Sequence, residues 1–348
     1  MKYAYVGCRT TKQRNARGKG IAVYRIGKDG AWKEIQCLPT EENPSYQCLD
    51  NTRRFLYSVH GDLTKISSYR IAADGTLTYL NTVDIGGKNP VDITVDRKNR
   101  NVIVATLQGG TLYTVTRRAD GSLGEVVAAY TCEGKEPGKV STIHQCLWDQ
   151  SGEYLFACAQ GRVNGYGQMR ALKYDLETGC FTETDRFLAR TWDEPRHAAM
   201  HPNNRWLYMV EEKGNKVLYF HFDVETGKLK GLQELSTVPE TVVGYSDASE
   251  IMIDPTGAYV VVSNRYTDSI AVYRIDPNTG YLRNVGFGPC LGKTPRFFCF
   301  GSNGKCYVAN EDSDTIIEFN WDSNSGTLTP TQNIVHTGSP VCIIFLDD

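Results

Sequence analysis

The stretch Ile270-Ala271-Val272-Tyr273-Arg274-Ile275, followed by the turn Thr279-Gly280, is the pattern on which the fold prediction rests. It reads as an alternating strand that enters a hairpin, because glycine accepts the positive φ that a tight turn needs. The same pairing of a strand with a glycine turn occurs seven times, at Asp29-Gly30, Asp74-Gly75, Asp120-Gly121, Thr178-Gly179, Thr226-Gly227, Thr279-Gly280 and Ser325-Gly326. A period of roughly 40 to 50 residues with several strands per copy is typical of sheets repeated around an axis.

Each copy has the same internal order: a short apolar strand, a polar turn, a second strand, a third strand, the glycine turn and an outer strand. Six copies are complete. The C-terminal strand Pro340–Phe345 and the N-terminal segment from Tyr3 to about Leu38 supply one more copy between them. We therefore predict an all-β fold, a seven-bladed β-propeller of four-stranded antiparallel blades. One blade is closed by both chain termini, and residues 1–348 form a single propeller domain.

Composition narrows the class of protein. Hydrophobic residues make up 41% of the chain, charged residues 22%, and the formal net charge is −2. We therefore expect no nucleic-acid partner. No apolar run approaches the roughly 18 residues that span a bilayer, so we expect no membrane partner. The N-terminal residues Met1–Gly7 read directly as a strand without a signal peptide, which favours a cytoplasmic protein. No feature of the sequence indicates an oligomeric state.

The chain has 11 cysteines, an odd number, and no Cys-x-x-Cys pair. Several of them lie inside predicted strands, where cysteine acts as a small hydrophobic residue. We predict reduced, structural thiols; the alternatives are a disulfide framework or a zinc site.

Equivalent residues of different blades converge on one axis, so aligning the copies shows which residues share a level of the central channel. Arg196 is equivalent to Ser45, Val91, His144, Ser249 and Arg296. The next position holds Tyr46, Asp92, Gln145, His197, Glu250 and Phe297. At the end of the second strand, Glu212 is equivalent to Gln160, Arg265 and Glu311. Strands with a structural role alone would repeat one residue type at each level; mixed charge converging on a channel is typical of a small polar site.

Several of these residues have simpler interpretations. His144, taken alone, fits a satisfied core histidine as well as a catalytic one, and Arg265 could anchor its own loop. His201 aligns with Asp50, Asp96, Asp149 and Asp254, so we predict a turn residue there. No local metal-binding or nucleotide-binding motif occurs, and we predict no metal and no cofactor.

At these residues the chain resembles the lactonase family of seven-bladed propellers, which includes bacterial propeller-type 6-phosphogluconolactonases and fungal carboxy-cis,cis-muconate cyclases. The matching stretches are Asn43–Tyr46, Glu194–Pro202, Leu207–Glu212, Glu250–Pro255, Ser263–Arg265, Pro295–Phe297 and Val308–Ile316. The family usually reads Gly-His after Ser-Asn-Arg, whereas this chain has Tyr266-Thr267. The second blade also departs from the usual Ala-Asn-Tyr-Gly-Gly-Gly, with Ala105-Thr106-Leu107-Gln108-Gly109-Gly110.

The resemblance implies a catalytic set of one histidine, two arginines and one glutamate, which falls here on His144, Arg196, Arg265 and Glu212. It implies a lactonase, a carboxylic ester hydrolase of carbohydrate metabolism that opens a sugar-type or anionic lactone such as 6-phosphogluconolactone. We expect Glu212 or His144 to act as general base and the two arginines to stabilise the oxyanion. Candidate substrate-binding residues at the same levels are Arg296, His197, Gln145, Glu250 and Asp92.

Two other functions remain open at this point. The same arginines could bind the carboxylates of a muconate-like diacid in a lactonising cycloisomerase. The propeller could also be a binding platform without catalysis, which would show an exposed apolar patch and no turnover.

Overall fold

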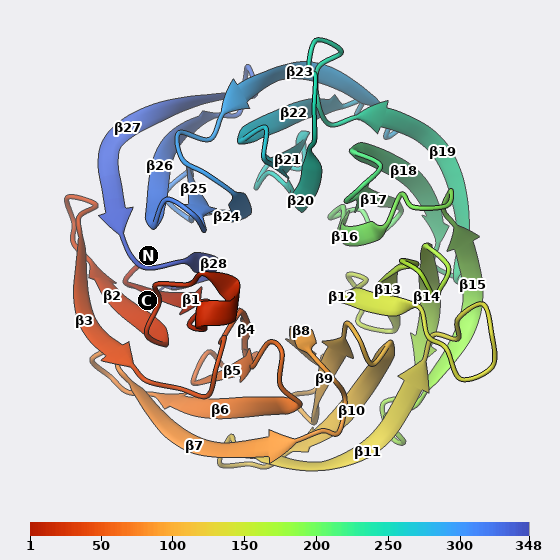
Figure 1. The fold of residues 1–348 in the computed structure, drawn as a ribbon, viewed down its shortest axis with the longest axis horizontal. Coiled ribbons are helices and arrows are strands. Elements are labelled where there is room, and N and C mark those ends of the chain that lie inside the picture. Colours follow the sequence, from red (N-terminus) through yellow and green to blue (C-terminus); the bar gives the residue numbers. More distant parts are fainter. Residues whose placement is uncertain (348) are drawn as a thin grey trace.

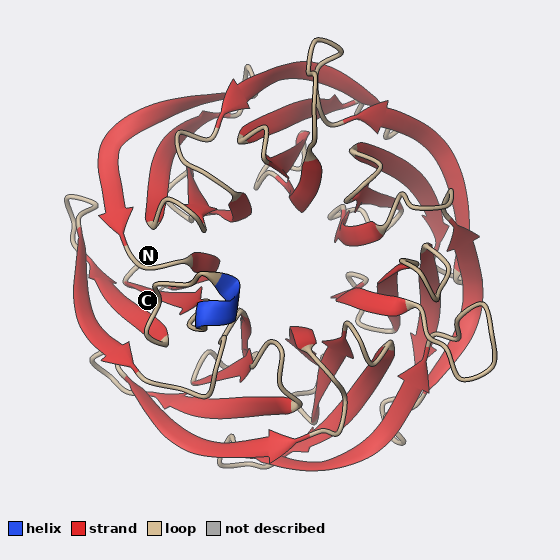
Figure 2. Cartoon of the chain, in the orientation of Figure 1, coloured by secondary structure: helices blue, strands red, loops and turns tan. Residues whose placement is uncertain are grey.

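The computed structural model describes residues 1–347 and arranges them as seven four-stranded sheets. Figure 1 shows the sheets as blades of a ring around a central axis, each with its first strand at the centre and its fourth at the rim. Every pairing inside a blade is antiparallel. The predicted seven-bladed β-propeller is confirmed. Almost all regular structure is strand, and the 3₁₀ helix η1 (Lys12–Arg14) lies close to the centre of one face (Figure 2).

The blades follow one another along the chain. Blade 1 contains β4 (Tyr46–Leu49), β5 (Phe55–Val59), β6 (Lys65–Ile71) and β7 (Leu77–Asp84), and blade 2 contains β8 (Pro90–Val95), β9 (Asn101–Thr106), β10 (Thr111–Arg117) and β11 (Leu123–Thr131). Blade 3 contains β12 (Thr142–Trp148), β13 (Tyr154–Gln160), β14 (Gln168–Tyr174) and β15 (Phe181–Leu188), and blade 4 contains β16 (Pro195–Met200), β17 (Trp206–Glu211), β18 (Lys216–Asp223) and β19 (Lys228–Ser236). Blade 5 contains β20 (Asp247–Ile253), β21 (Tyr259–Arg265), β22 (Ser269–Ile275) and β23 (Leu282–Pro289), and blade 6 contains β24 (Pro295–Phe300), β25 (Lys305–Asn310), β26 (Thr315–Asp322) and β27 (Thr327–His336).

The closing blade joins both ends of the chain, as predicted. It contains β28 (Pro340–Leu346), β1 (Tyr3–Cys8), β2 (Ile21–Ile26) and β3 (Trp32–Leu38) in that order from the centre. The strands β1 and β28 pair antiparallel, with Tyr3 opposite Leu346 and Val6 opposite Ile343. This pairing leaves no open edge between the first blade and the last, which is how a propeller protects its sheets.

The hairpin glycines have a second role besides turn geometry. Gly75 has φ 87°, and a Cβ there would lie 2.3 Å from ring atoms of Tyr3 in the neighbouring blade. The hydroxyl of Tyr5 donates a hydrogen bond to the Gly75 carbonyl at 3.0 Å. Blade 2 repeats the arrangement with Gly121, whose carbonyl accepts from Tyr57 at 3.0 Å. The recurring glycine therefore lets an aromatic side chain of one blade lie directly against the turn of the next.

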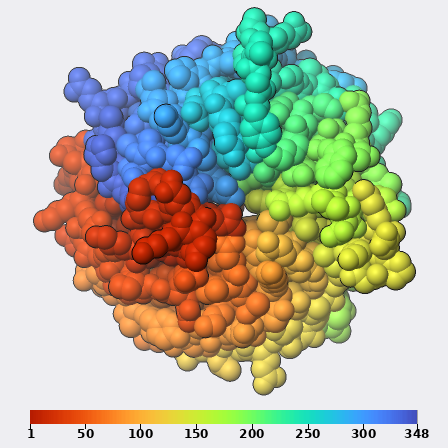
Figure 3. All heavy atoms as spheres, in the orientation of Figure 1, coloured from red at the N-terminus to blue at the C-terminus, as the bar shows by residue number. Residues whose placement is uncertain are grey.

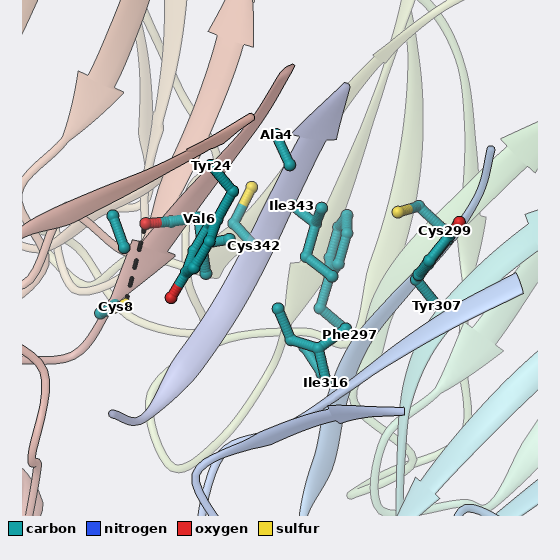
Figure 4. Close-up of a cluster of buried hydrophobic side chains, with 12 residues drawn as sticks. Ala4, Val6, Cys8, Tyr24, Phe297, Cys299, Tyr307, Ile316, Cys342 and Ile343 are labelled. Carbon is teal, nitrogen blue, oxygen red and sulfur yellow. Dashed lines mark hydrogen bonds between the residues drawn. The ribbon is translucent and has the colours of Figure 1, made fainter. Parts of the chain in front are cut away.

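The hydrophobic core lies between adjacent blades. Figure 4 shows one such cluster at the joint between the closing blade and blade 6, where Ala4, Val6 and Tyr24 face Phe297, Tyr307 and Ile316. Sheets that present apolar faces to each other in this way bury them around the whole ring. The cysteines of this cluster, including Cys8, Cys299 and Cys342, are part of the same packing.

All eleven cysteines are free thiols, as predicted. Eight of them are buried, and only Cys37 and Cys180 are exposed. Burial raises the pKa of Cys158 and Cys306 far above the ordinary value. These thiols are hydrophobic packing residues rather than nucleophiles.

Candidate active site

The innermost strands of most blades carry a β-bulge at the same end. In blade 4, Pro195 pairs with Glu211 and His197 with Val210, which leaves Arg196 as the extra residue between them. The same shift isolates His144 in β12 and Arg296 in β24. A bulge residue has no ladder partner, and the local twist re-aims its side chain. Here the bulges direct these side chains toward the centre of the ring, where all three line a hollow.

The channel has three levels, and the strand registers agree with the predicted equivalences. The bulge level holds Ser45, Val91, His144, Arg196, Ser249, Arg296 and Val341. The mouth level, where each second strand ends, holds Arg9, Gly61, Leu107, Gln160, Glu212, Arg265 and Glu311. The deep level, one residue beyond each bulge, holds Tyr46, Asp92, Gln145, His197, Glu250, Phe297 and Cys342.

Two adjoining hollows lie along the channel, an outer one at the mouth level and an inner one that reaches the deep level. The outer hollow has a volume of about 320 Å³ and is lined mainly by mouth-level and loop residues, among them Glu212, Arg265 and Lys213. The inner hollow, of about 20 Å³, reaches His197 and Glu250. His144 and Arg296 line both, so the two hollows lie next to each other. The face in Figure 3 is hollowed at its centre, beside the N-terminal segment in red.

Glu212 is held by three neighbours. Arg265 Nη2 lies 2.8 Å from its Oε1, and Arg196 Nε lies 3.3 Å from its Oε2. Gln160 Nε2 also donates to Oε2, at 2.5 Å. Burial by itself would raise the pKa of Glu212, but the charges of Arg265 and Arg196 outweigh it and lower the pKa far below its usual range. The side chain is a permanent carboxylate that orients two guanidinium groups.

The two arginines keep donors for a ligand. Arg196 Nη1 donates to the Ser249 carbonyl at 2.6 Å, and Arg265 Nη2 donates to the Ala248 carbonyl at 3.3 Å. Within residues 1–347, neither Arg196 Nη2 nor Arg265 Nη1 has a hydrogen-bond partner. Burial lowers the pKa of Arg196 to about 9, aided by the charge of Arg265, which leaves the group cationic at neutral pH. The pair is suited to an oxyanion or a carboxylate.

A buried chain of hydrogen bonds runs from a carboxylate to the hollow. Glu250 Oε1 lies 2.9 Å from His197 Nδ1, and His197 Nε2 lies 3.1 Å from His144 Nδ1. Since the carboxylate accepts from Nδ1–H of His197, the Nε2 of that ring accepts in turn, and His144 carries its proton on Nδ1. We assign the lone pair of His144 to Nε2, which has no protein partner within residues 1–347.

Burial keeps both rings neutral. It lowers the pKa of His144 well below the ordinary value, and the charge of Arg196 acts in the same direction. Burial also lowers the pKa of His197, although Glu250 opposes the shift. A neutral imidazole whose tautomer is set by a hydrogen-bonded partner is ready to accept a proton.

The other two deep-level candidates bind the backbone of the next blade. Asp92 Oδ2 accepts from the Cys146 amide at 2.7 Å, and Gln145 Oε1 accepts from the Ala198 amide at 2.6 Å. Burial raises the pKa of Asp92 to about 7, although the Cys146 amide opposes the shift. Neither residue is among those that line the hollows. The structure therefore brings His144, Arg196, Glu212 and Arg265 together and sets Asp92 and Gln145 apart from them.

Residues 3–345 match the model of the family described as lactonase, 7-bladed beta-propeller. The chain belongs to this lactonase family. A 6-phosphogluconolactonase of Bacillus subtilis is 29% identical over 311 residues, covering 87% of each chain. A 6-phosphogluconolactonase of Formosa agariphila is 27% identical and covers 96% of this chain and 97% of its own. The structure of a periplasmic gluconolactonase of Pseudomonas aeruginosa superposes with a TM-score of 0.89 at 26% identity, over 99% of both chains.

Family membership confirms the resemblance seen in the sequence and the prediction of an enzyme of the lactonase class. In this lactonase fold, no helix within the described residues is long and apolar enough to cross a membrane. Nor does any group of three or more His, Cys, Asp or Glu side chains in residues 1–347 form a candidate metal site.

Sequence reasoning missed one residue of the lactonase channel. Arg9 is the first residue after β1 and lies at the mouth level, at the position equivalent to Glu212. Its side chain is buried and lines both hollows. The signal was available in the register, because Arg9 follows the second strand of the closing blade as Glu212 follows β17.

Proposed function

We propose that this protein hydrolyses a sugar-type lactone, of the 6-phosphogluconolactone kind, without a metal and at the mouth of the central channel. The observation that carries the proposal is the neutral His144, whose free Nε2 shares a hollow with arginine N–H donors. Lactone opening needs a base for water and positive charge at the carbonyl oxygen, and this arrangement supplies both. The names of the relatives from Bacillus and Formosa support the substrate class.

In the first step, His144 Nε2 takes a proton from water as the water oxygen attacks the lactone carbonyl carbon. The carbonyl π bond breaks and its electron pair becomes the oxyanion. Arg196 and Arg265 stabilise that charge through the N–H groups that have no protein partner. The step is favoured because these donors are already in place before the charge develops.

In the second step, the oxyanion collapses and the bond from the carbonyl carbon to the ring oxygen breaks. The imidazolium of His144 returns its proton to the leaving oxygen, so the product is a hydroxy acid and the histidine is neutral again. Glu250 and His197 act through His144 by holding its tautomer and stabilising its charged form. Glu212 positions the arginines, since both of its carboxylate oxygens face Arg265, Arg196 or Gln160.

The test is turnover of 6-phosphogluconolactone and glucono-1,5-lactone by purified protein with EDTA present. The release of acid measures the rate. His144→Asn is expected to lose about 10²–10⁴-fold in kcat/KM, and Arg196→Ala about 10²–10³-fold. Matched controls are His221→Asn and Arg205→Ala, which change exposed residues that line neither hollow. Wild-type rates in both site variants, or activity lost to EDTA, would refute the proposal.

The same assay separates the cycloisomerase alternative. A carboxymuconate added to the panel would lose its ultraviolet absorbance on ring closure. If the protein converts that diacid and hydrolyses neither lactone, its reaction is lactonisation at the same arginines and not lactone hydrolysis.

We also propose that the protein acts in cytoplasmic carbohydrate metabolism. The free thiols, of which Cys37 and Cys180 are exposed, suit a reducing compartment. A relative from Pseudomonas is named as periplasmic, so the compartment is a property to measure for each member. Fractionation of cells that express the native chain, probed with an antibody, tests this part of the proposal.

A further inference from the structure

One side of the channel mouth holds two arginines and a single carboxylate. Arg9 Nε lies 3.5 Å from Glu311 Oε1, and Arg296 Nη1 lies 3.7 Å from Glu311 Oε2. Both separations are longer than a good charge-assisted hydrogen bond. The carboxylate therefore balances half of the positive charge and orients both guanidinium groups only loosely.

Arg9 also has unmet hydrogen-bonding capacity. Its side chain is 6% exposed, and its Nη1 is a buried donor without a hydrogen-bond partner within residues 1–347. Asp62 Oδ2 lies 4.0 Å from that atom and is hydrogen-bonded by Arg14 and Asn43. Burial lowers the pKa of Arg9 to about 9, and the charge of Arg296 adds to this effect. A buried donor of this kind is expected to find an acceptor in the working complex.

The chain holds Arg9 in place through its backbone. Its amide donates to the Ser339 carbonyl at 3.0 Å, and its carbonyl accepts from the Gly18 amide at 3.1 Å. Gly61, the mouth-level residue of blade 1, lies beside the guanidinium group: a Cβ there would lie 3.4 Å from Arg9 Nη1. The position is built by three separate segments rather than by a surface loop alone.

The charges around the whole space point the same way. Besides Lys213 and Asp247, six arginines line the hollows, namely Arg9, Arg14, Arg162, Arg196, Arg265 and Arg296. Four carboxylates line the hollows or pair with these arginines, namely Glu212, Glu250, Asp62 and Glu311. Lys213 and Asp247 pair with each other at 3.2 Å and add no net charge. The space therefore carries an excess of positive charge that is equal in size and opposite in sign to the charge of a phosphate dianion.

We propose that Arg9 and Arg296 form a subsite for the phosphate group of the substrate, and so select phosphorylated sugar lactones over neutral ones. This inference rests on the proposed lactone hydrolysis, because the phosphate in question belongs to the lactone substrate. Arg9, Arg296 and His144 line both hollows, so a ligand can place its phosphate on the arginines and its carbonyl beside the histidine. A volume of about 320 Å³ is within the usual range for such ligands.

The first test compares two lactones that differ only in the phosphate group. Arg9→Ala is expected to lose at least about tenfold in kcat/KM for 6-phosphogluconolactone, mostly through KM, and less than about threefold for glucono-1,5-lactone. Arg9→Lys should recover part of the loss because it keeps a charge without the planar fork. Lys12→Ala, which removes an exposed charge from the same loop, is the control. Equal losses on both lactones, or no loss on either, would overturn the subsite.

The second test needs no turnover. Inorganic phosphate and 6-phosphogluconate should raise the melting temperature of the wild-type protein, at constant ionic strength, more than gluconate does. Arg9→Ala should lose that difference; if it does not fold, Arg9→Lys serves in its place. Phosphate binding through Arg9 without any lactonase activity would leave the subsite standing and refute the proposed function. Lactonase activity with an unchanged phosphate preference in the Arg9 variants would support the proposed function and refute the subsite.

Discussion

The two ends of the innermost strands contrast sharply. At one end, each strand enters a turn, and Asp50, Asp96, Asp149 and Asp254 occupy the same position. Asp50 Oδ1 accepts from the amides of Arg54 and Phe55 at 2.8 and 3.0 Å, and Asp254 Oδ1 accepts from the amides four and five residues on, both at 2.8 Å. We call this the turn end. One residue type recurs in four blades because each of these turns needs the same backbone bonds.

At the other end, no residue type occupies more than two of the seven positions at the bulge level or at the mouth level. His144, Arg196 and Arg296 are equivalent in the fold, yet they differ in charge and in partners. Repetition at equivalent positions therefore marks structure in this protein, and variation marks function. The two ends give a direct way to test that rule.

A substitution at the turn end should lower the stability of the protein without lowering its catalytic activity. Asp149 is buried and accepts from the Glu153 and Tyr154 amides and from the Asn204 side chain of the next blade, at 3.0, 2.9 and 2.8 Å. We expect Asp149→Ala to lower the free energy of unfolding by about 1–3 kcal/mol, because several buried donors lose their acceptor. Urea unfolding measures this effect, and kcat/KM at 25 °C should stay within about twofold of wild type.

Asp175→Ala is the control for that variant, since Asp175 caps an outer hairpin at the surface and accepts from the Glu177 amide at 2.9 Å. Its effect on the free energy of unfolding should be smaller than that of Asp149→Ala, because its partners stay in contact with water. A loss of activity in folded Asp149→Ala would contradict the division between the two ends.

Substitutions on the channel side should change catalysis without lowering stability, and Glu250→Gln at the deep level tests this through the pH dependence of the rate. The amide oxygen can still accept from His197, so the tautomer of His144 is kept, but the negative charge is lost. Without that charge both histidines are harder to protonate, so their pKa values fall. The acid limb of the pH–rate profile should move to lower pH, and kcat/KM should fall about tenfold because the imidazolium is less stable.

Glu211→Gln is the matched buried control. Burial and the charge of Asp193 raise the pKa of Glu211 to about 8, so this side chain is mostly neutral at pH 7 already. Its substitution should leave the acid limb in place. An unshifted limb in Glu250→Gln, or a shift to higher pH, would rule out the carboxylate as the origin of the histidine chain.

The smallest effect is expected where blade 4 departs from the turn-end pattern. His201 accepts from the Asn203 amide at 3.1 Å and donates to the Gly257 carbonyl at 3.0 Å, which confirms it as a turn residue. Asn203 Oδ1 takes over the two amides that an aspartate would bind, at 3.0 and 3.2 Å. We expect His201→Asp to change unfolding free energy by less than about 1 kcal/mol, since one bond is exchanged for another. A larger loss in urea unfolding would show that His201 has a further role.

Much of this molecule could be read from its repeats. The hairpin glycines, the closing blade and the channel levels all follow from one period, because repeated backbone geometry needs repeated residues. The meeting of His144, Arg196, Glu212 and Arg265 was predictable for the same reason. Arg9 was not identified, because it lies at the start of a polar run, one residue after the alternating pattern of β1 has ended.

The sequence by itself therefore determined the propeller, its closure and the set of blades that supply polar groups to the channel. Only the tertiary structure decided which way those groups point and what they touch. A β-bulge is a register shift between two strands, and a tautomer depends on the atom opposite the ring, as between His197 and His144 at 3.1 Å. Both are properties of residues that are distant in sequence and adjacent only once the ring has closed.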